Sequence, residues 1–280
     1  MKKLQFFFFI MVLGAIASQQ MLGRQSNPDR FTIPLSDPAR PVFLKASLMA
    51  GSISVKGYAG KEVIVDVDVM TNKEDEEDGE DSRKRRGMRR IPNTSSGLSI
   101  EEENNEVMIT KSGYGSSDLK LNVQVPLNCS MKLNVVNGGE IEVEGVTGDL
   151  DINNTNNSVK LLKISGTVVA HALNGNLLVT MTKVTPDKAM SFSSLNGEVD
   201  VTLPPDIKAD VSLKADMNGE IYSDFDIVMD RSKPKLEEKR DKKGRFQVNV
   251  DKVMRGTING GGPEYTFKNF QGDIYIRKTK

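Results

Sequence analysis

The stretch Gly139-Glu140-Ile141-Glu142-Val143 contains the pattern on which the fold of this 280-residue chain depends. A glycine is followed by one polar residue and then by two apolar residues with a charged residue between them. Side chains two positions apart in a β-strand point to the same side, so Ile141 and Val143 share one face while Glu140 and Glu142 share the other. The stretch therefore predicts a short strand with one buried face and one exposed face.

Copies of this unit follow one another along the chain. Two of them are Gly148-Asp149-Leu150-Asp151-Ile152 and Asn157-Ser158-Val159-Lys160-Leu161, and others begin at Gly51, Gly166, Gly175, Gly197, Gly219 and Gly272. The central copies recur every nine or ten residues, and the copies that contain asparagine recur at about twice that spacing. Two strands therefore make one larger unit, and a fixed short period of this kind is typical of a repeat architecture.

The apolar positions of the units predict the core. One unit cannot bury its own apolar face, whereas a stack of units makes a continuous core. We expect the following side chains to be buried: Ile141, Leu150, Ile152, Val159, Leu161, Val168, Leu177, Val199 and Ile221. We expect the carboxylates of the units to point outward: Glu140, Glu142, Asp149, Asp151, Glu198, Asp200 and Glu220.

Two all-β architectures fit the units. In a parallel β-solenoid, successive coils stack and their corners repeat. In an antiparallel β-sandwich or meander, each Asn-Gly pair would be a two-residue hairpin turn, because both residues tolerate positive φ. The Asn-Gly pairs begin at Asn137, Asn174, Asn196, Asn218 and Asn259. The regular two-strand period favours stacked short strands in a solenoid, with the longer strands of the first hundred residues as a sandwich-like cap.

The N-terminus has the features of a cleavable signal peptide. Lys2 and Lys3 precede a short apolar run, which ends at the small-x-small site Ala15-Ile16-Ala17. The run is shorter than the ~20 residues that a membrane-spanning helix needs. We expect cleavage before Ser18 and a mature protein that is exported, periplasmic or extracellular, with no membrane span.

The segmentation of the chain follows from these patterns. Residues 1–17 are the expected signal peptide, residues 18–40 an N-terminal extension, and residues 41–280 a single β-repeat domain. Charged loops interrupt the domain at 72–92 and 230–245, because almost nothing apolar in them could offset the entropy of ordering.

The first charged loop has an acidic block followed by a basic block. The simplest interpretation is a solvated insertion whose charges neutralise one another. The alternative is a partner-binding loop that contacts a protein, a polyanion or a headgroup through its cations. Those cations are Arg83, Lys84, Arg85, Arg86, Arg89 and Arg90.

Composition excludes several functions. Lys plus Arg and Asp plus Glu are both 38, so no basic excess indicates nucleic-acid binding. The single Cys129 cannot form an intramolecular disulfide and is expected to be a small buried residue. The single His171 excludes a site with several histidine ligands and is expected to be an ordinary strand residue. We identify no catalytic, cofactor-binding or metal-binding residue and expect no cofactor.

The ordered set of motifs resembles a bacterial adhesin-like family of β-strand-repeat proteins. The resemblance lies in Gly51–Tyr58 followed by Glu62–Val65, in the repeated units between Asn137 and Tyr222, and in the ending Ile258–Pro263 and Gln271–Lys278. It implies a signal peptide, an all-β stacked fold and a surface or periplasmic setting. It supplies no catalytic residues.

Three functions remain open at this point. The first is a non-catalytic adhesin or binding module of the cell envelope, with a cell-surface or envelope protein or a glycan as its partner. The second is a periplasmic structural or assembly scaffold. The third is a polysaccharide-acting β-helix enzyme that uses a pair of outward carboxylates. With one histidine, no nucleophile motif and no cofactor fingerprint, we expect no enzyme activity.

Overall fold

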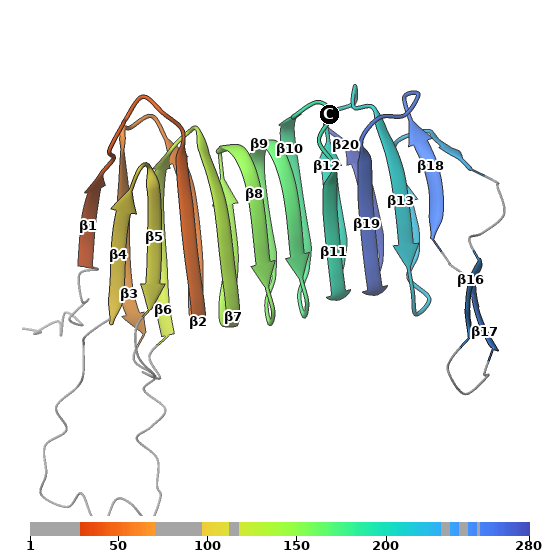
Figure 1. Ribbon diagram of the computed structural model, residues 1–280, viewed down its shortest axis with the longest axis horizontal. Coiled ribbons are helices and arrows are strands. Elements are labelled where there is room, and N and C mark those ends of the chain that lie inside the picture. The colour runs from red at the N-terminus through yellow and green to blue at the C-terminus, as the bar shows by residue number, and fades with distance from the viewer. Residues whose placement is uncertain (1–28, 71–96, 112–117, 231–235, 241–245, 251–252) are drawn as a thin grey trace, which may run out of the picture.

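The computed structural model describes residues 29–70, 97–111, 118–230, 236–240, 246–250 and 253–280, and within them every regular element is a strand (Figure 1). The strands of the first half are β1 (Asp29–Pro34), β2 (Val42–Tyr58), β3 (Glu62–Met70), β4 (Leu98–Glu103), β5 (Glu106–Lys111), β6 (Asp118–Pro126), β7 (Cys129–Glu144) and β8 (Thr147–Asn154). The next are β9 (Val159–Ala172), β10 (Leu177–Val184), β11 (Met190–Asn196), β12 (Val199–Leu203), β13 (Ala209–Ala215) and β14 (Ile221–Ser223). The last are β15 (Ile227–Met229), β16 (Leu236–Arg240), β17 (Phe246–Val250), β18 (Met254–Ile258), β19 (Glu264–Gln271) and β20 (Ile274–Lys278).

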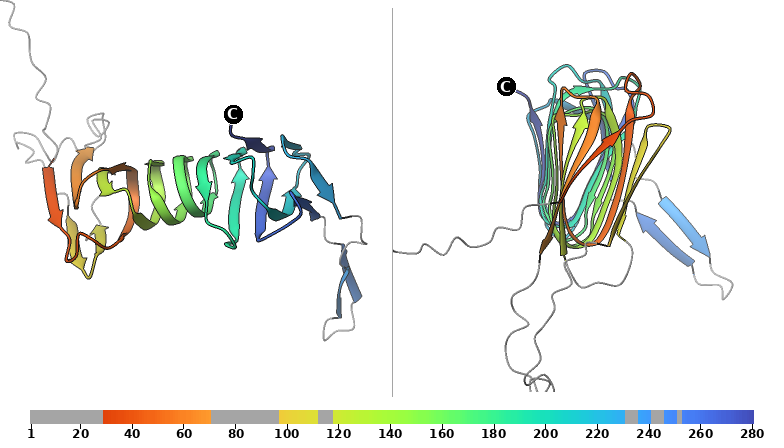
Figure 2. Two further views of the ribbon diagram at one scale, coloured as in Figure 1. Left: turned by 90° about the horizontal axis from the view of Figure 1, so that it is seen from above. Right: turned by 90° about the vertical axis from the view of Figure 1, so that its left-hand side faces the viewer.

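The strands form a flattened stack of coils with two walls that face one another (Figure 2). The first wall has the order β4–β5–β2–β7–β8–β9–β11–β19–β13–β18–β15. The second wall has the order β1–β3–β6–β2–β7–β9–β10–β12–β20–β14. The long strands β2, β7 and β9 turn a corner from one wall into the other and so belong to both.

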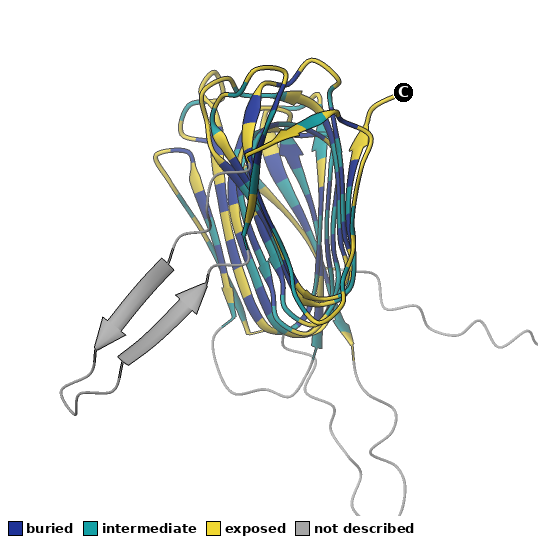
Figure 3. Cartoon of the chain, turned by 90° about the vertical axis from the view of Figure 1, so that its right-hand side faces the viewer, coloured by how far each residue is buried: buried dark blue, intermediate teal, exposed yellow. Residues whose placement is uncertain are grey.

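The core lies between the walls and consists of rows of equivalent residues. Neighbouring coils pair in parallel, so each apolar side chain lies next to its counterpart in the adjacent coil. One row of the second wall contains Ile53, Ile141, Val159, Leu177, Val199 and Ile274, all of them buried. Figure 3 shows buried segments alternating with less buried ones along the strands. This alternation is the period-2 pattern of the sequence seen in three dimensions.

The predicted core is confirmed except at one position. Ile141, Val159 and the other central residues are at most 3% exposed. Ile221 is only half-buried. It lies on β14, the last strand of the second wall, which pairs with β20 on one side and with no described strand on the other.

The parallel solenoid is confirmed, and the hairpin interpretation of the central Asn-Gly pairs is wrong. Asn137-Gly138, Asn174-Gly175 and Asn196-Gly197 belong to one row at a corner of the stack, where the chain turns into the facing wall. Gly166, at another close approach between coils, has φ +126°. A Cβ there would lie 2.0 Å from the Gly148 carbonyl oxygen, so only glycine allows the approach.

The order of the coils in space differs from their order in the sequence. The last coil of the chain, β19 and β20, lies between β11–β12 on one side and β13–β14 on the other. Figure 1 accordingly shows the C-terminus part-way along the stack, with β19 between β11 and β13. At the opposite end β2 pairs with β5 and β6, which follow it in the sequence, as well as with β7.

Antiparallel strands finish both ends of the stack. β1, β3 and β4 add to one end, and β18 and β15 add to the other. Because β1 comes from residues 29–34, part of the expected N-terminal extension joins the sheet. Part of the expected second charged loop forms β16, which pairs with β17 in a separate two-stranded sheet.

Candidate functional site

An asparagine ladder runs along the corner where the first wall turns into the second. The Nδ2 of Asn156 donates to Oδ1 of Asn137 at 2.6 Å, that of Asn174 to Asn156 at 2.9 Å, and that of Asn196 to Asn174 at 2.7 Å. The two inner amides, Asn156 and Asn174, each donate one of these bonds and accept another, so one residue type continues the row from coil to coil. The ladder explains why asparagine recurs at the two-strand spacing.

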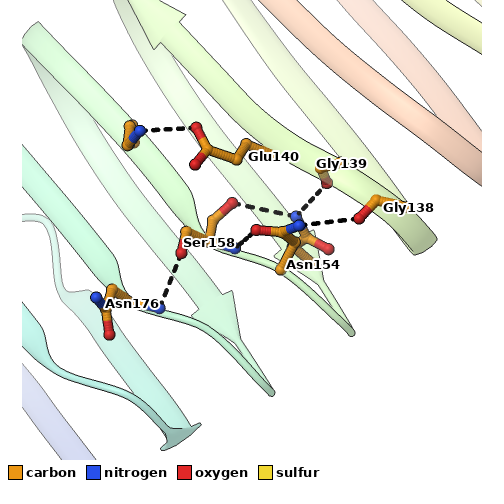
Figure 4. Close-up of polar contacts among 8 residues, drawn as sticks. Gly138, Gly139, Glu140, Asn154, Ser158 and Asn176 are labelled. Atoms are coloured by element: carbon orange, nitrogen blue, oxygen red, sulfur yellow. Dashed lines mark hydrogen bonds and ion pairs between the residues drawn. The ribbon is translucent and has the colours of Figure 1, made fainter.

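A second polar row begins the second wall, just past the ladder (Figure 4). The backbone N–H of Asn176 donates to the Ser158 hydroxyl at 3.1 Å, and the N–H of Glu198 donates to Oδ1 of Asn176 at 2.9 Å. The buried Asn154 closes the corner from inside, since its Nδ2 donates to the Gly139 and Ser158 carbonyls at 3.1 Å each. Each polar side chain in this row therefore binds the backbone of a neighbouring coil.

The polar row becomes acidic toward the C-terminal end of the stack. Beyond Ser158 and Asn176 it continues through Glu198, Asp273 and Glu220, which directly precede the adjacent strands β12, β20 and β14. The Glu220 N–H donates to Oδ1 of Asp273 at 2.9 Å. Adjacent strands lie ~4.8 Å apart, so three carboxylates in succession concentrate negative charge at this end.

Two stacked tyrosines stand beside the carboxylates. Tyr222 and Tyr275 have ring centroids 5.2 Å apart and planes inclined by 9°. The Tyr275 hydroxyl donates to Oδ2 of Asp273 at 3.1 Å, and the Tyr222 hydroxyl donates to Glu220. Tyr222 is 47% exposed on the last strand of the second wall. The ring face that it turns away from Tyr275 therefore meets no further strand in the described part of the wall.

A cation borders the tyrosines on the other side. The guanidinium carbon of Arg277 lies 5.0 Å from the centre of the Tyr275 ring, and its Nε donates to both Asp200 carboxylate oxygens at 2.8 and 3.0 Å. The charge of Asp200 is thus matched, whereas no ion pair involves Glu198, Glu220 or Asp273 within the described residues. We name Glu198, Asp273, Glu220, Tyr222 and Tyr275 the tyrosine surface.

The carboxylate environment changes the acidity of Tyr222. Its hydrogen bond to Glu220 and the charge of that carboxylate raise the pKa of the phenol to about 12 from its ordinary 10.0. The folded-state value lies above the unfolded one, so the neutral phenol is favoured by folding. This contribution is fully present below pH 10.0 and is lost as the pH rises toward about 12.

We expect Glu220→Gln to move the pKa of Tyr222 back toward its ordinary value, because the substitution removes the negative charge but keeps the side-chain shape. The measurement is phenolate absorbance during alkaline titration, with Tyr222→Phe subtracted to isolate this residue. As the matched control, Glu142→Gln on the same wall should leave the Tyr222 curve unchanged. An unaltered Tyr222 titration in Glu220→Gln would show that the two side chains do not interact.

The residues predicted from the sequence fall into two groups. The basic loop, Arg83, Lys84, Arg85, Arg86, Arg89 and Arg90, lies outside the described residues. The predicted outward carboxylates all lie on the outer surface, half-buried or exposed, and several are paired. Lys160 binds Glu140 at 2.7 Å, Lys132 binds Asp151 at 2.7 Å, and Arg277 binds Asp200.

Cys129 and His171 have the environments that we expected for them. Cys129 is fully buried, and burial raises the pKa of its thiol to about 12, so the thiol is inert. His171 lies on β9, where its Nδ1 is 2.8 Å from the Ser193 hydroxyl. Within the ranges that the structure describes, no group of three or more candidate ligands is arranged to hold a metal ion. In the same ranges, no helix is long and apolar enough to cross a membrane.

Sequence reasoning missed the tyrosine surface. The signal was present, since Ile221-Tyr222 and Ile274-Tyr275 occupy the same position of two repeat units. The units are 53 residues apart in the sequence, and only the insertion of the last coil makes them neighbours.

Comparisons with known proteins found similar structures but no sequence relatives. No family model matches the chain, and no curated protein matches it. A candidate cell adhesion protein from Clostridium sporogenes has 11% identity and a TM-score of 0.38, over 90% of this chain and 100% of the other. A candidate adhesin from Bacteroides fragilis has 9% identity and a TM-score of 0.38, over 91% and 98%. Another, from Parabacteroides merdae, has 9% identity and a TM-score of 0.23, over 91% and 98%.

Proposed function

We propose that this protein is an exported, non-catalytic binding module of the cell envelope, with an adhesin-like role, and that the tyrosine surface is its contact surface. The observation that carries the proposal is the stacked pair Tyr222 and Tyr275, held rigidly beside Asp273 and Glu220 at the end of an exposed wall. Tyrosine is enriched at binding hot spots because its ring buries a large area with little loss of conformational freedom.

The surroundings of the tyrosines favour binding over catalysis. The rings, carboxylates and Arg277 lie on the outer face of a wall. Both tyrosine hydroxyls and Arg277 are each hydrogen-bonded to a neighbouring carboxylate. A rigid, preformed surface loses little entropy when a partner binds. The unmatched charge of Glu198, Asp273 and Glu220 favours a partner whose facing surface is neutral or basic.

The proposal is tested with the protein that begins at Ser18, labelled with a fluorophore and mixed with envelope fractions of the cells that produce it. We expect Tyr222→Ala with Tyr275→Ala to weaken binding about tenfold or more, since aromatic hot spots contribute about 2 kcal/mol each. Phe31→Ala is the matched control, because Phe31 is an exposed aromatic residue, 43% exposed, on β1 at the other end of the stack. Equal binding by both variants and the parent would remove the tyrosine surface from the proposal.

Export is measured on the same protein as it is recovered from the producing cells. The fraction outside the cytoplasm is expected to contain a chain whose N-terminal residue is Ser18. A membrane-bound product that retains Met1 would contradict the proposal that the protein is exported with cleavage before Ser18. The proposal that the tyrosine surface binds a partner would still be tested by the envelope assay.

A further inference from the structure

A cleft of about 440 Å³ lies where the order of the coils departs from the order of the sequence. The connection from β12 to β13, residues 204–208, has to pass the inserted coil, because β13 pairs with the far side of β19. Three connections together surround the cleft: this one, the connection from β10 to β11 and the connection from β18 to β19. Its volume lies within the ~300–1,000 Å³ typical of small-molecule sites.

A buried phenol with no partner lines the cleft. Tyr265, the second residue of β19, is 1% exposed, and its hydroxyl makes no hydrogen bond with any residue that the structure describes. Three side-chain atoms in the described ranges are sealed from solvent without a partner, namely Asn154 Oδ1, Thr167 Oγ1 and Asn269 Oδ1. The Tyr265 hydroxyl is not one of them, so it retains access to solvent. Tyr265 is also one of the residues that line the cleft.

The charged groups around the cleft balance one another. Lys183 and Lys208 contribute two ammonium groups, and Asp187 and Asp206 contribute two carboxylates. All four side chains are exposed, and no ion pair involves any of them in the described ranges. The rim thus offers both hydrogen-bond donors and acceptors, and its positive and negative groups are equal in number.

Three prolines contribute to the remaining lining. Pro186, Pro204 and Pro263 each present a ring with a restricted φ, one from each connection. Proline and tyrosine rings offer flat C–H surfaces against which an apolar ligand face can pack. A ligand suited to this lining has one apolar face, several hydroxyl groups that both donate and accept, and no net charge.

We propose that this cleft binds a neutral mono- or disaccharide, with the Tyr265 hydroxyl bonded to a sugar hydroxyl and the rim lysines and aspartates bonded to others. The site is separate from the tyrosine surface and extends the proposed function to a second, glycan-binding position on the same module. An anionic ligand would be repelled by the two rim carboxylates, and a cationic ligand would be repelled by the two rim lysines.

The test is saturation-transfer NMR on the protein that begins at Ser18, with glucose, galactose, mannose, N-acetylglucosamine and lactose as probes. We expect transfer to at least one of the five, and about tenfold weaker binding in Tyr265→Phe, which removes only the hydroxyl. Tyr58→Phe, whose hydroxyl bonds the Glu62 carbonyl far from the cleft, is the matched control and should bind as the parent does. Because the lost hydroxyl has no partner among the described residues, Tyr265→Phe should melt no lower than the parent.

Three results would overturn the proposal: no transfer to any of the five sugars, full-strength transfer in Tyr265→Phe, or transfer only to glucuronate or arginine used as charged probes. If Tyr265→Phe fails to fold, Lys208→Gln on the exposed rim replaces it with the same expected loss of sugar binding. The envelope assay with Tyr222 and Tyr275 is independent of the sugar titration. A negative sugar titration would leave the proposed function intact, and a negative envelope assay would leave the sugar-binding cleft intact.

Discussion

A chain that ends at Pro263 is expected to lose the ordered structure of the C-terminal third of the stack, although only 17 of its 280 residues are missing. Residues 264–280 form β19 and β20, which are the parallel partners of β11–β12 on one side and of β13–β14 on the other. Their loss leaves a gap inside the stack and removes Phe267, which stacks on Phe192 at 5.2 Å in the core. In a solenoid whose coils follow sequence order, the same truncation would remove only the end coil.

The measurement is thermal unfolding by circular dichroism, with limited proteolysis to locate the newly exposed segments. We expect cleavage in β12 to β18, and a melting temperature lower by about 10 °C or more, since Phe267 alone accounts for about 3–5 kcal/mol. The matched control replaces residues 231–252 by a short Gly-Ser linker, because β16 and β17 form a separate two-stranded sheet and pair with no other described strand. A short linker can join the flanking residues, since the Asp230 N–H donates to the Arg255 carbonyl at 2.8 Å. Truncation at Pro263 that is no more harmful than this control would mean that the last coil is not internal.

Ile141→Asp is expected to destabilise the protein by about 4 kcal/mol or more. Ile141 is 0% exposed and lies in a row between Ile53 and Val159. An aspartate there loses the apolar contacts and also places a carboxyl group where no described residue provides a cation. The destabilisation is measured as the shift of the urea unfolding midpoint. It should be smaller at low pH, because the carboxyl group can then enter the core in its neutral form.

The matched control for Ile141→Asp is the next residue, Glu142, whose side chain points to the opposite side of the wall. Glu142→Gln should change stability by less than about 0.5 kcal/mol. Lysine is a poorer replacement, because Glu142 pairs in register with Lys160 and a second cation would repel it. Equal urea midpoints for Ile141→Asp and Glu142→Gln would reverse the assignment of inner and outer faces.

The repeat unit by itself determined the class of the fold and most of the core. Alternation at Ile141 and Val143 placed one face inside because a strand has a period of two whatever its surroundings. The two-strand spacing of Asn137, Asn174 and Asn196 favoured stacked corners over hairpins. These predictions were confirmed because they depend only on strand geometry and on the alternation of apolar and polar residues, and both can be read from a short stretch of sequence.

Only the tertiary structure decided which units are neighbours. The units are so alike that any two of them can pair with similar free energy. The local pattern therefore does not specify which unit pairs with which. The insertion of β19 and β20 brings Tyr275 beside Tyr222 and opens the cleft that Tyr265 lines. It also leaves β14 at the end of the wall, which half-exposes Ile221. The core thus follows from the period of the chain, whereas the candidate sites follow from pairings between distant coils.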